Sequence, residues 1–471
     1  MTELTEILEL VDNSAKLEDG AIKVTNAARF RATLGSLVET SALGSSASAG
    51  WARFVLRSAA LQQGVIPSSI HDLYKARGRG DVPVTFTVPA LNLRVLSYDS
   101  ARAVFRVAKR LNAGAFIFEI ARSEIGYTGQ RPAEYSSNIL AAALAEGWTG
   151  PVFIQGDHFQ VSPKKYSEDA THELNAVRAL AGEAIAAGFF NIDIDTSTLV
   201  DISKPTVPEQ QETNFRLTAA LAAHIREIGP KGVAISVGGE IGEVGGHNST
   251  AEELRAFMDG FRSELAKLGP GKEGLSKISI QTGTSHGGKV LPDGSLARVQ
   301  IDFDTLQALS RIARSDYGLG GTVQHGASTL PEDAFHKFVE HEAIEVHLAT
   351  NFMTIFYNHA PDDLRRQMYG WLDENRGADR KADMTDEQFY YKSRKYALGP
   401  FKAQLYGLPE KARARIIEAW EAQFGQLFDL LGMKDTRRYV EAFVHPVKVQ
   451  PTMKSEAGQH AAGVTASDLQ D

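Results

Sequence analysis

The feature that most constrains the fold of this sequence is an alternation of short apolar segments with amphipathic segments, repeated about eight times from residue 83 onward. The apolar segments are typical of buried strands, and segments such as 97–111 (SYDSARAVFRVAKRL) carry apolar residues at helical spacing. Strands that each need a helical crossover form a parallel sheet, so the pattern predicts an α/β fold, a closed (β/α)8 TIM barrel. The expected strands cover residues 85–91, 114–120, 151–157, 188–195, 232–240, 277–283, 320–326 and 343–349.

Segments on both sides of the barrel predict helical extensions. Amphipathic stretches such as EKARARIIEAWEAQFGQLFDLLG follow the last expected strand, and the end of the chain is small and polar. The expected organisation is a helical N-terminal extension (1–82), a TIM-barrel catalytic domain (83–360), a C-terminal helical extension (361–450) and a mobile tail (451–471).

Composition narrows the class of protein. With 471 residues, 43% hydrophobic and 23% charged, the chain is typical of soluble globular proteins. The net charge of −8 argues against a nucleic-acid partner, and no apolar run is long enough to predict a membrane span. The N-terminus lacks the basic and apolar regions of a signal peptide, which predicts a cytoplasmic protein. Because there is no cysteine, any metal site must use His, Asp and Glu.

Polar residues close most of the expected strands. In a TIM barrel the active site is built at the C-terminal strand ends. A lone histidine there is more often an ordinary loop residue, but three at equivalent ends favour a catalytic zinc site with an open fourth position. The strand-end residues are Asp157, His158, Asp195, Glu240, His286, His325 and Thr350.

Two of these histidines are followed by glycine, in the sequences HGGK (286–289) and HGAS (325–328). Glycine lets backbone N–H groups approach a ligand closely, and consecutive N–H groups form a concave site for anions. Ser328 and Thr350 add hydroxyl donors. The loops therefore favour a sugar phosphate as the substrate class.

The motifs GDH, GGEIGEVGG, TSHGG and QHGAS together resemble the class II, zinc-dependent fructose-bisphosphate aldolase family. The resemblance runs from VPALNL (88–93) to about residue 400. It implies that His158, His286 and His325 bind the catalytic zinc and that Asp157 is the acid/base. It also implies that Glu240 and Asp195 lie near the metal, where they bind a second or displaced ion.

The same resemblance implies further binding residues and an assembly. FYYKSR (389–394) resembles a family segment that ends in an arginine reaching a neighbouring subunit's substrate, so Arg394 is a candidate for the second phosphate. Family membership also implies a homodimer or homotetramer. The candidates for the pocket that binds phosphate and a monovalent cation (Na⁺ or K⁺) are Gly287, Gly326, Ser328, Thr350 and Asn351.

The sequence departs from the family pattern in three ways, one of which is the long N-terminal extension before the barrel. The family has a glutamate on a mobile loop that moves a proton on the substrate, whereas this chain has His247 and Asn248 there. His247 is the candidate replacement base, because imidazole titrates near neutrality. An Asn-x-Asp pair after the last strand is replaced by His347 and Ala349. His347 is either a substrate contact or an ordinary core histidine.

Together these observations favour zinc-dependent aldol cleavage of a phosphorylated ketose. The favoured substrate is fructose 1,6-bisphosphate, with dihydroxyacetone phosphate and glyceraldehyde 3-phosphate as products. The alternatives are a relative that acts on a different sugar phosphate and a non-catalytic barrel subunit. Asp157 argues against the last, because a structural zinc has no need of an acid facing its open position.

Overall fold

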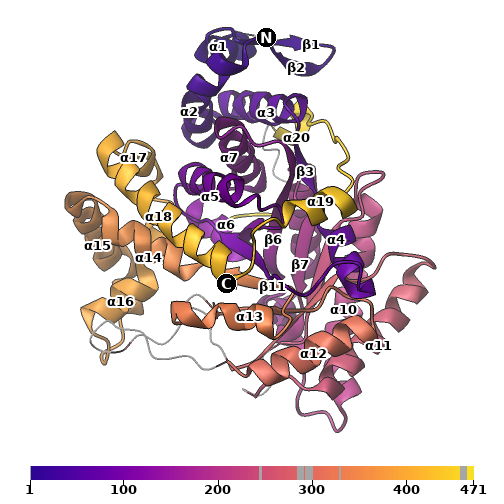
Figure 1. Ribbon diagram of the computed structural model, residues 1–471. Coiled ribbons are helices and arrows are strands. Elements are labelled where there is room, and N and C mark those ends of the chain that lie inside the picture. The colour runs from indigo at the N-terminus through magenta and orange to yellow at the C-terminus, as the bar shows by residue number, and fades with distance from the viewer. Residues whose placement is uncertain are drawn as a thin grey trace.

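A closed barrel of eight parallel strands forms the centre of the protein (Figure 1). The computed structural model describes residues 2–242, 247–283, 291, 301–327, 330–456 and 464–470. The last barrel strand pairs with the first, Val346 opposite Pro89, so the sheet closes and the predicted TIM barrel is confirmed. The strands are β4 (Val88–Asn92), β5 (Ile117–Ala121), β6 (Gly150–Gln160), β7 (Asn191–Asp195), β8 (Ser236–Glu240), β9 (Lys277–Ile280), β10 (Thr322–Gln324) and β11 (Glu345–Leu348).

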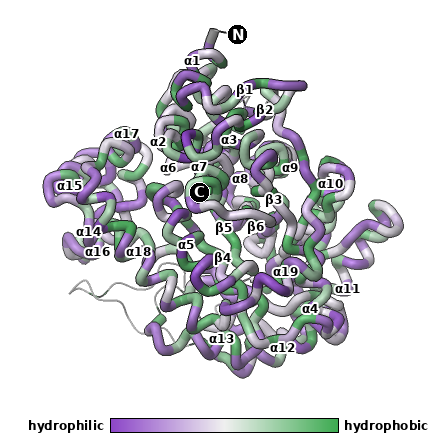
Figure 2. Tube along the Cα trace, turned by 45° about the horizontal axis from the view of Figure 1, so that its top comes forward, coloured by the Kyte–Doolittle hydropathy of each residue, from purple (hydrophilic) through white to green (hydrophobic). Residues whose placement is uncertain are grey.

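Helices surround the barrel, and most of them bury one face. On α5, Val104 and Phe105 are fully buried, whereas Arg102 and Arg106 lie on the opposite face and pair with Glu146. The tube in Figure 2 accordingly changes from hydrophobic to hydrophilic every few residues along many of the helices. The helices are α5 (Ser97–Leu111), α6 (Arg122–Thr128), α7 (Pro132–Ala145), α8 (Pro163–Glu168), α9 (Ala170–Ala186), α10 (Val207–Ile228), α11 (Ala251–Leu268), α12 (Phe303–Ser315), α13 (His336–Glu340) and α14 (Thr350–His359).

The N-terminal extension contains strands as well as helices. Its β3 pairs in parallel with the first half of β6, Val65 opposite Gly150, so the extension joins the barrel sheet. Asn191 reinforces this junction by donating hydrogen bonds to the carbonyls of Ser68 and Ile154. The elements are α1 (Thr2–Leu10), the hairpin β1 (Ala15–Glu18) and β2 (Ala21–Val24), α2 (Ala27–Leu43), α3 (Ser46–Gln62), β3 (Val65–Ser68) and α4 (His71–Arg79).

Most of the C-terminal helices pack on one side of the barrel, where Figure 1 shows α15 to α18 grouped together. Trp420 of α18 is fully buried, and its indole donates to the Phe352 carbonyl at 2.9 Å. These helices are α15 (Asp362–Arg376), α16 (Asp386–Ser393), α17 (Lys402–Tyr406) and α18 (Glu410–Leu430). The two helices that follow lie elsewhere: α19 (Arg437–Phe443) contacts α4, and α20 (Met453–Glu456) contacts α3.

The described end of the chain lies against the barrel. Arg122 donates to the Asp468 carbonyl at 3.0 Å, and His172 Nε2 lies 3.0 Å from the Asp468 carboxylate. These contacts hold residues 464–470 beside α6 and α9. The mobility expected for 451–471 as a whole stays a prediction, as do the domain bounds.

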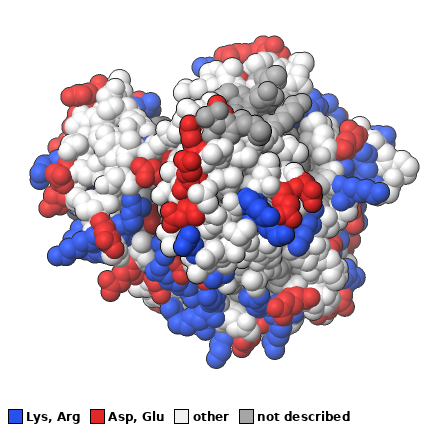
Figure 3. All heavy atoms as spheres, turned by 90° about the horizontal axis from the view of Figure 1, so that it is seen from above, with Lys and Arg blue, Asp and Glu red and all other residues white. Residues whose placement is uncertain are grey.

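The surface carries charges of both signs. On the face seen from above, acidic and basic side chains lie in small groups beside one another (Figure 3). Within the described parts of the chain, no helix combines the length and apolarity that a bilayer crossing requires.

Candidate metal and active site

A bulge at the end of β6 presents Asp157 and His158 together. Neighbouring side chains of a regular strand point to opposite faces, but the pairing of β6 with β7 shifts register between Gly156 and Phe159. His158 adopts a positive φ of 41°, a strained conformation for a residue with a side chain. A Cβ on Gly156 would lie only 2.5 Å from the Phe159 ring, so the bulge needs glycine there. The bulge lets the acid and the imidazole face the same barrel mouth.

The structure brings four of the predicted metal-site residues close together: His158, Asp195, Glu240 and His325. With Asp157, we call them the upper cluster. His158 Nδ1 lies 3.6 Å from a carboxylate oxygen of Asp195 and 3.6 Å from one of Glu240. His325 Nδ1 lies 3.8 Å from Glu240, and the rings of His158 and His325 are 4.3 Å apart. Imidazole nitrogens and carboxylate oxygens are zinc ligands, so this donor set fits the implied metal.

The acids and histidines of the upper cluster shift one another's pKa values. Burial, reinforced by the charge of Asp195, raises the pKa of Glu240 to about 8. Burial acts against charge on Asp195 too, but hydrogen bonds with His158 and Ser197 bring its pKa below the usual value. Burial also disfavours protonation of His158, yet the charge of Asp157 and the Asp195 hydrogen bond raise its pKa well above the ordinary one. The carboxylates therefore attract positive charge strongly.

The predicted replacement base lies apart from this cluster in the described structure. The side chain of His247 is 55% exposed, its Nδ1 contacts the Asn248 carbonyl at 2.8 Å, and its Nε2 lies 3.9 Å from Glu253. Among described residues, no contact joins His247 to the upper cluster. Its role as a base stays a prediction.

Of the predicted phosphate-binding residues, the structure describes Gly326, Thr350 and Asn351. Gly326 follows His325 directly with a φ of +69°, a conformation that favours glycine. Thr350 and Asn351 begin α14 just after β11 and are partly exposed. The predicted residues His286, Gly287 and Ser328 lie outside the described residues.

Arg394 lies buried within its own chain. Its guanidinium donates to Thr354 Oγ1 at 2.7 Å and covers the ring of Tyr391, while its Nε forms no hydrogen bond with a described residue. Burial, with a smaller contribution from Arg94, lowers its pKa. Arg94 follows β4 and pairs with Glu124 at 2.8 Å. Burial opposes its charge, but Glu124, Tyr127 and Asp157 raise its pKa above the ordinary value.

A second polar group, not predicted from the sequence, lies inside the barrel below the upper cluster. Glu345 lies at its centre and accepts hydrogen bonds from Gln155, Lys277 and His347 at 3.1, 2.5 and 2.6 Å. Burial opposes its charge, but Lys277 and His347 lower its pKa to about 2. The available signal was single charged residues within apolar strand segments, as in KISI and AIEVHLA. We call this group the lower cluster: Tyr74, Gln155, Asp193, Lys277 and Glu345.

His347 lies between the two clusters and is only 6% exposed. Its Nδ1 is 3.1 Å from an oxygen of Glu119 and 3.2 Å from Asp157 Oδ1, and its ring is 4.2 Å from that of His325. Burial, reinforced by the charge of Asp157, raises the pKa of Glu119 to about 7. Glu119 lies near the end of an expected strand but was not among the predicted site residues. The structure therefore places His347 beside the proposed catalytic acid.

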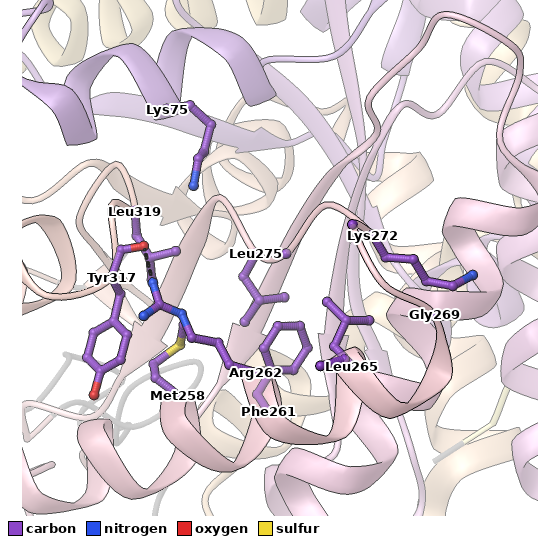
Figure 4. A pocket seen from close by; sticks show the side chains of 13 residues that line it. Lys75, Met258, Phe261, Arg262, Leu265, Gly269, Lys272, Leu275, Tyr317 and Leu319 are labelled. Atoms are coloured by element: carbon purple, nitrogen blue, oxygen red, sulfur yellow. Dashed lines mark hydrogen bonds between the residues drawn. The ribbon is translucent and has the colours of Figure 1, made fainter.

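A separate pocket of about 250 Å³ lies at the opposite end of the barrel (Figure 4). Its residues 269–275 precede β9 and its residues 317–319 precede β10, so it opens at the N-terminal ends of these strands. In Figure 4, Arg262 donates to the Tyr317 carbonyl, at 2.8 Å. None of the predicted site residues lines this pocket.

Comparisons with known proteins point to one family and one fold. The family model described as fructose-bisphosphate aldolase class-II matches residues 84–411. The structure of the fructuronate-tagaturonate epimerase UxaE from Cohnella laeviribosi is similar with a TM-score of 0.52 and 13% identity, covering 90% of each chain. A probable tagatose 6 phosphate kinase from Sinorhizobium meliloti 1021 gives 0.51 and 16%, covering 80% of this chain and 100% of that one. At these identities both structures support the fold alone.

A fructose-bisphosphate aldolase from Campylobacter jejuni is 18% identical with a TM-score of 0.46, covering 79% of this chain and 97% of its own. No curated protein sequence matches this chain.

Proposed function

Because the chain belongs to the class II fructose-bisphosphate aldolase family, we propose that it catalyses zinc-dependent aldol cleavage of a phosphorylated ketose. The proposed substrate is fructose 1,6-bisphosphate, cleaved to dihydroxyacetone phosphate and glyceraldehyde 3-phosphate. The observation that carries this proposal is the upper cluster, where two imidazoles and three carboxylates meet at the C-terminal strand ends.

His158 and His325, with His286, are the proposed zinc ligands, and Glu240 and Asp195 are proposed to hold a second or displaced position of the ion. A zinc ion bound there would act as a Lewis acid toward the negative charge that develops on the ketose oxygens. Asp157 is proposed to take the proton of the C4 hydroxyl as the bond between C3 and C4 breaks, and to return it in the reverse reaction. The bulge of β6 supports this role, because it turns Asp157 toward the same mouth as His158.

The phosphate groups of the substrate are proposed to meet two sets of donors. Gly326 and the start of α14 at Thr350 and Asn351 are proposed for one phosphate, together with Gly287, Ser328 and a monovalent cation. Arg394 and Arg94 are proposed for the other. The Nε–H of Arg394 is buried, and no described residue accepts a hydrogen bond from it, which supports an anionic partner there. His247 is proposed as the base that replaces the family's loop glutamate.

A second candidate is C4 epimerisation of a sugar acid, in which the same bond breaks and re-forms on the opposite face. It is favoured by His347 and Ala349, which replace the family's Asn-x-Asp pair. The fructuronate-tagaturonate epimerase that shares the fold supplies the reaction to test. A sugar carboxylate would suit the two arginines as well as a phosphate does. Epimerisation keeps all carbon atoms of the substrate in one molecule, whereas cleavage divides them between two products.

The test is dihydroxyacetone phosphate release from fructose 1,6-bisphosphate by the purified protein, with zinc added and again after a chelator. We expect release that needs zinc and returns when zinc is restored. Folded, zinc-loaded protein that releases no triose phosphate contradicts cleavage of this substrate. Fructuronate offered to the same sample, with tagaturonate measured by chromatography, then decides for or against the second candidate. If the protein catalyses neither reaction, a different sugar-phosphate substrate or a non-catalytic subunit is favoured.

A further inference from the structure

We infer that the pocket at the N-terminal ends of the barrel strands (Figure 4) binds a small organic anion, a phosphate or carboxylate head group attached to an apolar body. Such a site is separate from the proposed reaction, because the upper cluster lies at the C-terminal ends of the strands. Among the described residues that line the pocket, none is acidic and three are basic: Lys75, Arg262 and Lys272.

The head groups of Lys75 and Arg262 reach the same short segment of the pocket wall, residues 317–319. Arg262, on α11, donates to the Tyr317 carbonyl at 2.8 Å. Lys75, on α4, places its Nζ 3.9 Å from the position that a Cβ on Gly318 would take. Figure 4 shows the two side chains approaching this segment from their separate helices. Two positive charges therefore face one small space.

The charge of Lys75 has no partner within the described part of the chain, where no residue accepts a hydrogen bond from its Nζ or forms an ion pair with it. Burial lowers the pKa of Lys75; the charge of Glu273 opposes this, whereas Arg262 and Arg79 lower the pKa further. The guanidinium of Arg262 has five N–H donors, and its described acceptors are only the carbonyls of Asp316 and Tyr317. An anion between Lys75 and Arg262 would offset their repulsion and accept from both.

The acids near the pocket already have partners. Glu273 lies between two lining residues but does not line the pocket, and its carboxylate is 3.8 Å from His71 Nε2. The interaction with His71 outweighs burial and lowers the pKa of Glu273 to about 2. Further acids beside lining residues are engaged as well: Glu227 with Lys272, Asp259 with Tyr317, Glu264 with Lys267 and Asp316 with Arg255.

The rest of the pocket wall is apolar, which sets the body of the ligand. Buried side chains of α11 and of the segments before β9 and β10 form it, and an apolar group would gain by packing there. The volume of about 250 Å³ is below the range of about 300–1,000 Å³ that drug-sized ligands occupy, so a single ring with its head group fits best. These side chains are Met258, Phe261, Leu265, Leu275 and Leu319.

The experiment is isothermal titration calorimetry of the full chain with phenyl phosphate and with benzoate. We expect saturable binding to the wild type, and the probe that binds more tightly identifies the head group. Lys75→Met and Arg262→Gln should each weaken binding about tenfold or more, because each removes a charge-assisted hydrogen bond. Lys16→Met is the matched control: it removes the same charge from an exposed lysine on β1 and should leave binding unchanged.

Wild-type protein that binds neither probe overturns the inference. So does binding that both variants keep, because the probe then occupies another site such as the upper cluster. Inorganic phosphate that binds as tightly as phenyl phosphate would overturn the apolar part of the assignment. If Lys75→Met does not fold, Arg262→Gln decides, since the Arg262 side chain is exposed. Binding here without cleavage would end the aldolase proposal alone, and cleavage without binding would end this one.

Discussion

The upper and lower clusters lie two residues apart on shared strands, yet their carboxylates meet different partners. Asp157 and Asp195 belong to the upper cluster, and Gln155 and Asp193 on the same strands belong to the lower one. Below, Glu345 accepts hydrogen bonds from four donors, and its pKa falls to about 2. Above, Glu240 lies among other acids, and its pKa rises to about 8. The lower cluster therefore stabilises the fold by pairing opposite charges, whereas the upper cluster carries the excess of acids that the proposed zinc ion would offset.

The largest effect should follow from Asp157→Asn in the upper cluster. Removing a general acid/base lowers kcat by about 10²–10⁴-fold, so cleavage of the favoured substrate should fall by that factor. Steady-state kinetics measures it, with zinc content determined on the same samples. Unchanged kcat would mean that Asp157 does not move the proton.

Lys277→Met should show that the lower cluster stabilises the fold. Lys277 is 1% exposed and pairs with Asp193 and Glu345, and removing one partner of a buried ion pair costs about 3–5 kcal/mol. Urea unfolding of the metal-free protein measures this loss. The matched upper-cluster change, Glu240→Gln, should leave the free energy of unfolding equal or raise it. Equal losses in the two variants would abolish the distinction between the clusters.

Gly156→Ala tests the bulge that separates the clusters. The added methyl would lie 2.5 Å from the Phe159 ring, and crowding of this kind costs about 1–3 kcal/mol. Gly35→Ala on α2 is the control, since open space surrounds that position and alanine favours helix by about 0.5–1 kcal/mol. Thermal unfolding should therefore move in opposite directions for the two variants, and a shift in the same direction would contradict the crowding.

The smallest effect concerns pH. A carboxyl whose folded pKa is raised stabilises the fold below its unfolded pKa, and this contribution is lost as pH rises through the folded value. For Glu240 that window runs from about 4.5 to about 8, so metal-free protein should lose stability across it. Glu345 acts in the opposite sense, because its contribution is lost only as pH falls toward about 2. Urea midpoints against pH should show a shallower slope in Glu240→Gln, and an unchanged slope would remove Glu240 as its cause.

Much of the fold followed from the sequence. Each of the eight expected strands overlaps an observed one, because apolar segments alternating with amphipathic helices leave a parallel barrel as the compact arrangement. The proximity of His158, Asp195, Glu240 and His325 was also predictable, since the C-terminal ends of barrel strands converge.

The contacts of Glu119 and Lys277 could not be predicted in the same way. Each is a single charged residue in a mainly apolar strand, and its partners come from strands far apart in the chain. The strand pattern identifies buried positions, but it does not give the register across the barrel that brings these charges together. The strand that the N-terminal extension adds to the barrel sheet, β3, lacked a sequence signal of the same strength.

By itself, the sequence determined the alternating units, the closed barrel, the family and most of the residues that meet at the strand ends, because these depend on local periodicity and on order along the chain. Only the tertiary structure decided which charged residues contact one another. It placed His347 between Glu119 and Asp157, gave Glu345 its four donors and left Glu240 among acids. Those outcomes depend on distances of a few ångströms between separate strands, and such distances exist only once the barrel has closed.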